Sequence, residues 1–373
     1  MAKIKVLECI RQGQIGGGES HLLSLVENLD QSVFHPIVLS FTDGPMIERL
    51  TKMNIETHVI YTEKPFDITK WKQVKKLLQE KKIDIVHAHG TRANSNVLWA
   101  ARSLKIPVIY TVHGWSFHHD QNPIVRMLRV AGEKYLVKNS TQNISVSKSN
   151  QQSGKILIPS FNSTVINNGI DQKKFNPQKE YKNIRQELGI KNDIIFILFI
   201  ARFTVQKQPI SLIHSFAEAL SSNPNLHLVM VGNGDQKKEA IELIDKLKIK
   251  DKITLLPFRQ DVPDMLSNAD IFVLPSLWEG LPIGLLEAMA MGKAVITTNV
   301  DGTSEVIQNN ENGLLIDTDN LIPNLTNTLL VLSKQKELRE RFGKEAIKTI
   351  NNRYNAVNMT LLIENIYSKA VNL

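Results

Sequence analysis

Short apolar runs alternate with amphipathic stretches along the whole chain, and this alternation limits the fold more than any other feature. In the first half, the runs expected to form strands are Ile4–Ile10, Pro36–Phe41, Thr57–Thr62, Asp84–His89, Pro107–His113 and Asn143–Ser147. The helical stretches between them are expected to begin near Ser20, Met46, Thr69, Ala93 and Pro123. Strands that alternate with helices in this way are typical of a parallel sheet with helices on its faces.

The same pattern starts again in the second half, after a polar and charged stretch from Asn168 to Asp193. The strands expected there are Ile194–Ala201, His227–Gly232, Ile253–Pro257, Ile271–Ser276 and Ala294–Thr298. Because 373 residues exceed what one hydrophobic core usually holds, the restart predicts a second domain. The expected fold class is therefore α/β, with two Rossmann-like doubly wound domains joined by the polar stretch.

The composition narrows the setting in which such a chain works. Its single cysteine, Cys9, excludes an intramolecular disulfide and lies in the first expected strand, where a small core residue fits better than a nucleophile. The N-terminus does not resemble a signal peptide, and no window approaches the roughly 20 apolar residues of a membrane span. We therefore expect a cytoplasmic protein, peripheral to a membrane at most.

The formal net charge of +8 indicates an acidic partner, which is nucleic acid, an anionic membrane surface or a phosphate-bearing substrate. Nucleic acid is disfavoured because the basic residues are scattered and lack stacking aromatics. Basic residues do gather in Lys70–Lys82 and Ile124–Lys138, where they alternate with apolar positions. Such helices usually cover a core, but the second, with Arg126 and Arg129, is also a candidate for contact with anionic lipid.

A strand-to-helix turn between Pro275 and Gly292 carries two glutamates in an otherwise apolar run. The helix is expected over Gly284–Met291, with Glu279 in the loop before it and Glu287 in its first turn. Either glutamate alone is most simply a solvated side chain or a complement to the helix dipole. As a pair around this turn, they suit the binding of a nucleotide-sugar.

The start of this helix is also expected to bind a phosphate, because the first amides of a helix lack acceptors within it. The amides concerned are those of Gly284, Leu285 and Leu286. Two carboxylates also suggest the acid and nucleophile of a glycosidase, but a hydrolase has no need of a phosphate cradle.

Further motifs follow one another in an order that resembles one enzyme family. They are GGGE at Gly16–Glu19, DIVHAHG at Asp84–Gly90, TVHG at Thr111–Gly114, INNGID at Ile166–Asp171, ARFTVQK at Ala201–Lys207, VGNGD at Val231–Asp235 and DGTSEVI from Asp301. Together with the run from Glu279 to Thr298, they resemble the retaining glycosyltransferases of family four over nearly the whole chain. The resemblance implies the GT-B fold, in which two Rossmann-like domains face each other across a cleft.

The resemblance also implies roles for residues of the second domain. Arg202 and Lys207 match the family's diphosphate-binding pair, and their place between a strand and a helix suits an anion site. Glu287 would bind the ribose, while Glu279 would contact the transferred sugar and stabilise positive charge at its anomeric carbon. The remaining positions of the donor wall are Gly232, Gly234, Phe258 and Arg259. The last two would read the base partly through backbone atoms.

In the first domain, the resemblance implies that Gly16 and Gly17 face the donor phosphates and that His113 contacts the donor sugar. His113 ends the fifth expected strand, and the carboxyl ends of strands line the crevice of such a sheet. The glycine run does not match GxGxxG, so a nicotinamide cofactor is not expected.

A metal site is not expected, although four histidines suggest one: His87, His89, His118 and His119. His87 and His89 alternate on a strand and so point to one face, yet the sequence offers no third ligand for zinc. Asp317 and Asp319 form a D-x-D pair but lie far past the donor motifs. The resemblance likewise implies no bound metal and no cofactor beyond the donor substrate.

The resemblance implies a retaining, hexosyltransferase-type glycosyltransferase of cell-surface polysaccharide assembly. The donor would be a UDP-sugar or a GDP-sugar, with UDP favoured, and the acceptor a hydroxyl of a glycan or lipid-linked saccharide. We expect an acceptor-binding domain over residues 1–172, completed by a C-terminal helix at about 355–373, and a nucleotide-sugar-binding domain over 173–354. The alternatives are a nucleotide-sugar epimerase or hydrolase of the same fold and, more remotely, a basic nucleic-acid-binding protein.

Overall fold

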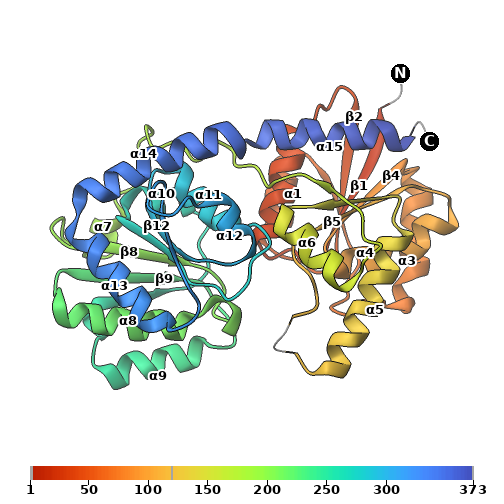
Figure 1. The fold of residues 1–373 in the computed structure, drawn as a ribbon. Coiled ribbons are helices and arrows are strands. Elements are labelled where there is room, and N and C mark those ends of the chain that lie inside the picture. The colour runs from red at the N-terminus through yellow and green to blue at the C-terminus, as the bar shows by residue number, and fades with distance from the viewer. Residues whose placement is uncertain (1–2, 119–120, 372–373) are drawn as a thin grey trace. The chain divides into compact units, whose positions relative to one another are not determined.

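The computed structural model describes residues 3–118 and 121–371, and the chain divides into two compact units. Unit 1 consists of Met1–Gly169 and Ala356–Leu373, and unit 2 of Ile170–Asn355 (Figure 1). The prediction placed the boundary between the units after residue 172, whereas the structure places it after Gly169. Residues 170–172 belong with unit 2 because the Ile170 amide donates to the Tyr354 carbonyl at 2.8 Å and Asn355 donates to Gln172 at 3.2 Å.

Within its described residues, unit 1 is built on seven parallel strands in the order β3-β2-β1-β4-β5-β6-β7. They are β1 (Ile4–Ile10), β2 (Phe34–Ser40), β3 (Glu56–Val59), β4 (Ile85–His89), β5 (Val108–Val112), β6 (Gln142–Ser145) and β7 (Thr164–Val165). The order reverses between β1 and β4. Ligands of open α/β sheets bind outside the carboxyl ends of such a strand pair.

Helices cover both faces of this sheet because its strands are apolar on both sides. They are α1 (Gly17–Asn28), α2 (Pro45–Lys52), α3 (Ile68–Lys81), α4 (Thr91–Ser103), α5 (Pro123–Asn139), α6 (Lys148–Leu157) and α15 (Ala356–Val371). Leu78 of α3 and Val97 of α4 are buried in one cluster with Leu7 of β1. Val6, which precedes Leu7 in β1, is buried with α1 and α15 on the opposite face of the sheet. Successive side chains of a strand point to opposite faces.

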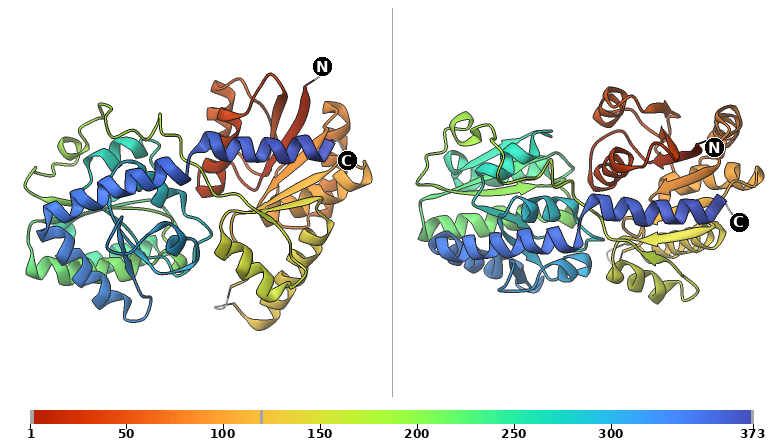
Figure 2. Two further views of the ribbon diagram at one scale, coloured as in Figure 1. Left: turned by 45° about the horizontal axis from the view of Figure 1, so that its top comes forward. Right: turned by 90° about the horizontal axis from the view of Figure 1, so that it is seen from above.

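The C-terminal helix α15 belongs to unit 1, although 186 residues of unit 2 precede it. Its apolar stripe is Met359, Ile363, Ile366, Tyr367 and Ala370, all buried against the sheet and α1. Figure 2 shows the helix, in blue, lying along the elements of this unit. Because each such side chain contributes roughly 1.5–3 kcal/mol of apolar burial, the helix is an integral part of the unit 1 core.

Unit 2, which the structure describes throughout, has six parallel strands in the order β10-β9-β8-β11-β12-β13. They are β8 (Ile195–Ile200), β9 (Leu226–Val231), β10 (Ile253–Leu256), β11 (Ile271–Leu274), β12 (Ala294–Thr298) and β13 (Leu314–Ile316). The helices are α7 (Ile184–Glu187), α8 (Pro209–Ser222), α9 (Lys237–Leu247), α10 (Val262–Asn268), α11 (Ile283–Ala290), α12 (Asp301–Val306), α13 (Leu321–Lys334) and α14 (Lys336–Arg353). Here the order reverses between β8 and β11. The two parallel sheets confirm the predicted α/β class.

Two helix starts differ from the prediction. α1 begins at Gly17 rather than near Ser20, since the Ser20 amide already donates to the Gly16 carbonyl at 2.9 Å. The low helix propensity of glycine hid this start in the sequence. α11 begins at Ile283 rather than Gly284. Over residues 3–118 and 121–371, no helix is long and apolar enough to span a membrane.

Candidate active site

In unit 2, the loops after β8 and β11 approach each other because these strands are neighbours in the sheet. A 3-10 turn over Val205–Lys207 follows β8. The Gln206 side chain donates to the Trp278 carbonyl at 2.8 Å, and the Leu277 amide donates to the Gln206 carbonyl at 2.8 Å. These two bonds hold the turn against the loop that carries Glu279.

Lys207 and Glu279 form an ion pair at this edge of the sheet, with the ammonium in direct contact with Oε1. Their side chains are only 15% and 7% exposed. Removing one partner of such a pair leaves an uncompensated buried charge, which costs roughly 3–5 kcal/mol. Arg202, exposed just after β8, adds a second cation to the same edge. The structure thus brings the predicted phosphate and sugar residues of this unit together.

The start of α11 corrects two predictions. The Leu286 amide donates to the Pro282 carbonyl at 3.3 Å, so it is used within the helix. The first three amides, those of Ile283–Leu285, are the ones without an intrahelical acceptor, and no side chain caps them. Glu287 lies in the second turn, because the helix starts one residue earlier than predicted. Glu287 therefore follows the amides at the helix start by about one turn and is not among them.

Gly232 and Gly234 allow two loops of unit 2 to approach closely. A Cβ on Gly232 would lie 2.1 Å from the Ala201 carbonyl oxygen, and Gly232 also has a φ of +140°. A Cβ on Gly234 would lie 2.2 Å from the Phe203 carbonyl oxygen. Both contacts are with the loop after β8, so the glycines shape the backbone that carries Arg202.

The two positions predicted to read the base differ in how their side chains are used. Phe258 is 38% exposed. Arg259 donates from Nε to Asp261 at 2.8 Å and from Nη1 to Glu187 at 2.5 Å, and these partners raise its pKa further. Its guanidinium is thus committed to unit 2, and only its backbone suits the predicted role.

Lys237, which the sequence did not single out, closes the neighbouring loop. Its ammonium donates to the Gly232 carbonyl at 3.1 Å and lies 4.2 Å from the ring centroid of Phe203. Burial lowers its pKa. The only signal in the sequence was a lysine next to VGNGD, which any basic protein supplies.

In unit 1, the glycine loop and His113 lie at the same end of the sheet. Gly16 is the N-cap of α1 and, being a glycine, has no side chain that could cap the helix. A Cβ on Gly17 would meet none of the described atoms within 4 Å, whereas a Cβ on Gly18 would lie 3.6 Å from Cδ2 of His113. Gly18, the residue after the two predicted glycines, is therefore the glycine of this loop that lies against His113.

His113 is part of a histidine cluster with His21, His87 and His89. Its Nε2 lies 3.1 Å from Nδ1 of His89, and the His21 ring meets it edge-on with centroids 4.8 Å apart. Nε2 of His89 lies 2.9 Å from the Glu8 carboxylate. The cluster gathers side chains from β1, α1, β4 and the residue after β5.

Burial lowers the pKa values of His21, His89 and His113 and so keeps these three imidazoles neutral. Desolvation, followed by the charges of neighbouring histidines, lowers the pKa of His21 to about 3 and that of His113 well below its usual value. The pKa of His89 falls to about 4, mainly because of burial. Burial alone would raise the pKa of Glu8, but His87 and His89 together lower it, so the carboxylate stays ionised.

Sequence reasoning missed Glu8, His21 and Tyr367 as partners in this cluster. Glu8 had a usable signal, because a carboxylate in an otherwise apolar buried strand needs partners. Tyr367 had none, since its hydroxyl donates to Glu8 at 2.6 Å from the far end of the chain.

The cluster also supplies what the sequence lacked for a metal hypothesis. Within the part of the chain that the structure describes, two groups have ligand atoms within 4.8 Å of one another: His21 with His89 and His113, and Glu8 with His87 and His89. The missing third ligand was therefore available, from strands and a helix that the sequence could not bring together. His119, which the sequence also suggested as a ligand, lies outside the described residues. The absence of a metal requirement stays a prediction.

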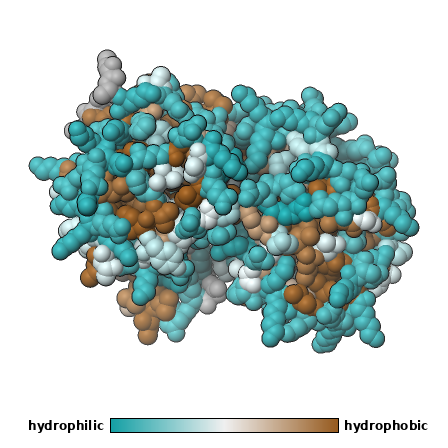
Figure 3. Space-filling model, turned by 180° about the vertical axis from the view of Figure 1, so that it is seen from behind, coloured by the Kyte–Doolittle hydropathy of each residue, from teal (hydrophilic) through white to brown (hydrophobic). Residues whose placement is uncertain are grey.

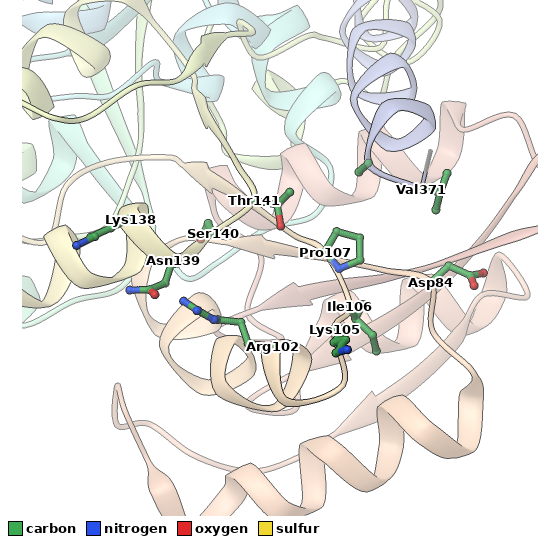
Figure 4. Close-up of a pocket in the computed structure, with 11 residues that line it drawn as sticks. Asp84, Arg102, Lys105, Ile106, Pro107, Lys138, Asn139, Ser140, Thr141 and Val371 are labelled. Atoms are coloured by element: carbon green, nitrogen blue, oxygen red, sulfur yellow. The ribbon is translucent and has the colours of Figure 1, made fainter. Parts of the chain in front are cut away.

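A pocket of about 720 Å³ opens at the opposite edge of the unit 1 sheet (Figure 4). Asp84, Pro107 and Thr141, which line it, stand immediately before β4, β5 and β6. It therefore lies at the amino ends of these strands and contains none of the predicted site residues.

Comparison with known proteins gives matches over almost the whole chain. The family profile described as "Glycosyltransferase Family 4" matches residues 15–174, and that described as "Glycosyl transferases group 1" matches residues 180–349. Anabaena HepE, solved in complex with UDP and glucose, superimposes with a TM-score of 0.85 and 21% identity over 98% of this chain and 100% of its own. This likeness establishes the fold.

Two curated relatives are similar over most of their length. The UDP-Gal:α-D-GlcNAc-diphosphoundecaprenol α-1,3-galactosyltransferase of Escherichia coli is 29% identical, with 78% of this chain and 77% of the relative covered. The N,N'-diacetylbacillosaminyl-diphospho-undecaprenol α-1,3-N-acetylgalactosaminyltransferase of Campylobacter jejuni is 30% identical, with 73% of each covered.

The two parallel sheets and these matches define an enzyme of the GT-B architecture. The chain belongs to the family 4, group 1 glycosyltransferases and is a hexosyltransferase-type enzyme.

Proposed function

We propose that the enzyme transfers a sugar from a UDP-sugar, with retention of configuration, to a hydroxyl of a saccharide linked through diphosphate to a polyprenyl lipid. The observation that carries this proposal is the edge of unit 2. There a buried Lys207–Glu279 pair lies in the loops beside α11, whose N-terminus has no side-chain cap. One place thus offers cations, amides and carboxylates, which are the groups that a nucleotide-sugar requires.

The diphosphate would be bound by Arg202, Lys207 and the amides of Ile283–Leu285. An ammonium has three N–H donors, so Lys207 can contact Glu279 and a phosphate oxygen together. Glu287 would accept hydrogen bonds from the ribose hydroxyls. Charge develops on the phosphate as it leaves, and preoriented cations and amides stabilise such charge strongly in a site shielded from water.

Transfer with retention requires departure and attack on the same face of the sugar. The bond from the anomeric carbon to the phosphate oxygen breaks, and the acceptor oxygen forms a new bond to that carbon. The acceptor proton passes to the leaving phosphate oxygen. Glu279 would stabilise the positive charge at the anomeric carbon, and His113 would contact a hydroxyl of the same sugar. Gly16 and Gly17 would allow the backbone to approach the donor phosphates.

The choice of UDP and of a lipid-linked acceptor rests on relatives. The Escherichia coli relative is named for UDP-galactose and a diphosphoundecaprenol acceptor, and the Campylobacter jejuni relative for a diphospho-undecaprenol acceptor. Anabaena HepE was solved with UDP. A role in cell-surface polysaccharide assembly follows from such acceptors. The chemistry itself needs no metal if the cations and amides of unit 2 meet the phosphate charge.

The direct test is product analysis with radiolabelled UDP-hexoses, UDP-N-acetylhexosamines and their GDP counterparts, with and without an undecaprenyl-diphosphate-linked saccharide. We expect label in the lipid fraction, only with a UDP-sugar and only with acceptor, and an α-linkage by NMR. Release of free sugar or an epimerised donor regardless of acceptor would instead identify a hydrolase or epimerase. Glu279→Gln should abolish transfer, while Glu311→Gln, at an exposed position of the same unit, should not.

We further propose that unit 1 docks at the inner face of the cell membrane through the start of α5. Ile124, Met127 and Leu128 are 63–65% exposed there, beside Arg126 and Arg129. Figure 3 shows apolar surface at the lower end of this unit. Exposed apolar side chains flanked by arginines suit the boundary between headgroups and acyl chains of an anionic bilayer.

Vesicle sedimentation tests this docking. The double variant Met127→Ser/Leu128→Ser should lose binding to vesicles that contain phosphatidylglycerol, while Ile156→Ser, which alters a 69% exposed isoleucine of α6, should keep it. Equal sedimentation of all three proteins, or sedimentation independent of anionic lipid, would remove the membrane proposal and leave the transfer reaction untouched.

A further inference from the structure

A hydrogen-bonded chain of buried side chains runs behind His113 in unit 1. Glu8, His87 and His89 are at most 1% exposed. Glu8 contacts His89 at 2.9 Å and Tyr367 at 2.6 Å, and His87 contacts both the Tyr367 hydroxyl at 2.5 Å and the Thr111 hydroxyl at 2.8 Å. Buried polar networks of this kind are costly unless every member is satisfied, so their proton positions are tightly constrained.

The carboxylate of Glu8 fixes the direction of the bonds that it receives from Tyr367 and His89, because an ionised carboxylate only accepts. Tyr367 must therefore donate its single proton to Glu8. Its oxygen then accepts from Nδ1–H of His87, which lies 2.5 Å away. Burial and the charge of Glu8 raise the pKa of Tyr367, which keeps that proton in place.

His113 is joined to Glu8 through His89, on the other side of the carboxylate. A neutral His89 has one ring proton, and it must be on Nε2, which faces Glu8. Nδ1 of His89 is then an acceptor. Nε2 of His113 lies 3.1 Å from it and must donate. Because His113 is neutral as well, its Nδ1 carries a lone pair and no proton.

We propose that Glu8 and His89 are positioning residues that hold His113 in the tautomer with Nε2 protonated and Nδ1 free to accept a hydrogen bond from a hydroxyl of the donor sugar. The inference rests on the proposed contact between His113 and that sugar. Without the hydrogen bonds from Glu8 through His89, a neutral imidazole would populate two tautomers and two ring orientations. Only part of the protein molecules would then present an unprotonated Nδ1 to the sugar. A buried carboxylate that orients a histidine through its second nitrogen is a general device for selecting one tautomer.

His21 packs edge-on against the His113 ring. Its Nδ1 contacts the Asn168 amide oxygen at 2.9 Å. An amide oxygen only accepts, so the His21 proton lies on Nδ1. Its ring therefore restricts rotation of His113 without adding a charge.

The test is a long-range 1H–15N correlation spectrum of the histidine rings in the full chain, with His113→Gln used to assign the signals. We expect the parent His113 to show a protonated Nε2 and an unprotonated Nδ1 at pH 7.5. A protonated Nδ1 in the parent would overturn the proposal even if no variant folds. Stoichiometric transition metal retained by the purified protein at His21, His89 and His113 would also overturn it, because metal would then occupy the lone pairs.

Two variants connect the tautomer to transfer. Glu8→Gln should mix the two tautomers of His113 and lower kcat/KM for the UDP-sugar about 10–100-fold, by analogy with the loss caused by removing the partners that orient metal-binding histidines. Tyr367→Phe removes one hydrogen bond from the same carboxylate but leaves Glu8 facing His89. It should keep the tautomer and stay within about threefold of the parent.

Calorimetric titration with UDP separates the inference from the function on which it rests. UDP affinity of Glu8→Gln should stay within about twofold of the parent, because other residues would bind the nucleotide. A parent that binds no UDP would refute the proposed function. A parent that binds UDP and transfers sugar, with an unchanged tautomer in Glu8→Gln, would refute the positioning role alone.

Discussion

The two units share an architecture but place opposite kinds of chemistry at the point where the strand order reverses. Unit 2 gathers charges: a Lys207–Glu279 pair, Arg202 and Glu287. Unit 1 gathers neutral imidazoles whose protons are fixed by one buried carboxylate. The same sheet topology therefore decides where a ligand binds, and the side chains after the strands decide which part of it.

The difference follows from what each unit would bind. Phosphates carry charge that must be met by cations and amides, whereas sugar hydroxyls are neutral and need acceptors and donors in fixed directions. In unit 1 the ionised Glu8 is buried, and hydrogen bonds from His89 and Tyr367 offset the cost of burying its charge.

The largest expected effect is in unit 2. Lys207→Ala leaves Glu279 buried without its partner, so we expect a loss of roughly 3 kcal/mol in the free energy of unfolding and about 10³-fold in transfer. The double variant Lys207→Ala/Glu279→Ala should recover part of the stability and none of the activity. Denaturant unfolding and initial rates measure both. Lys238→Ala, which alters an 89% exposed lysine of the same unit, is the control and should change stability by less than about 0.5 kcal/mol.

Acid should separate the two units. The unfolded chain takes up protons on His21, His89 and His113 as the pH falls through about 6.5, whereas the folded chain does not, because their folded pKa values lie well below this. Stability of unit 1 is therefore lost on acidification, on the order of 3 kcal/mol between pH 7 and 5.5. The lowered pKa of Glu8 adds nothing in this window, since its unfolded value is near 4.3.

Hydrogen exchange of peptides from β1 and β4, compared with β8 and β11 and corrected for intrinsic rates, measures this loss. Unit 2 has His227 with a lowered pKa and should lose less. Equal loss in both units would show that the imidazole cluster is not what makes unit 1 acid-sensitive.

Substitutions at Gly232 of unit 2 and Gly17 of unit 1 should also have different effects on stability. Gly232→Ala places a Cβ 2.1 Å from the Ala201 carbonyl oxygen at a φ of +140°, and we expect unit 2 to lose about 2 kcal/mol. Thermal unfolding with and without UDP measures it. An unchanged melting temperature would contradict the close approach of these loops.

Gly17→Ala should have the smallest effect. Its Cβ meets none of the described atoms within 4 Å, so stability should change by less than about 0.5 kcal/mol. If Gly17 faces the donor phosphates, transfer should nevertheless fall about 10-fold, a barrier increase of about 1.4 kcal/mol. Parallel kinetics and unfolding of this one variant decide it, and full activity would remove Gly17 from the site.

The sequence predicted what depends on local pattern and missed what depends on long-range contacts. The alternation of apolar runs predicted both sheets, and the order of motifs predicted the family. The predicted start of α11 was one residue too late. In the structure, Glu287 therefore lies in the second turn, and the Leu286 amide donates to a carbonyl of its own helix start. Glu8 and Tyr367 are 359 positions apart, and only the return of α15 to unit 1 brings them together.

The most direct test of the contrast between the units is calorimetric titration of UDP and of the UDP-sugar into the parent, Glu287→Ala and His113→Ala. We predict that Glu287→Ala weakens binding of both ligands about 10–100-fold, since hydrogen bonds to a charged group contribute roughly 1.5–3 kcal/mol. His113→Ala should leave UDP affinity within about twofold and remove only the additional affinity for the UDP-sugar. Loss of UDP binding in His113→Ala, or unchanged UDP binding in Glu287→Ala, would contradict the assignment of nucleotide to unit 2 and sugar to unit 1.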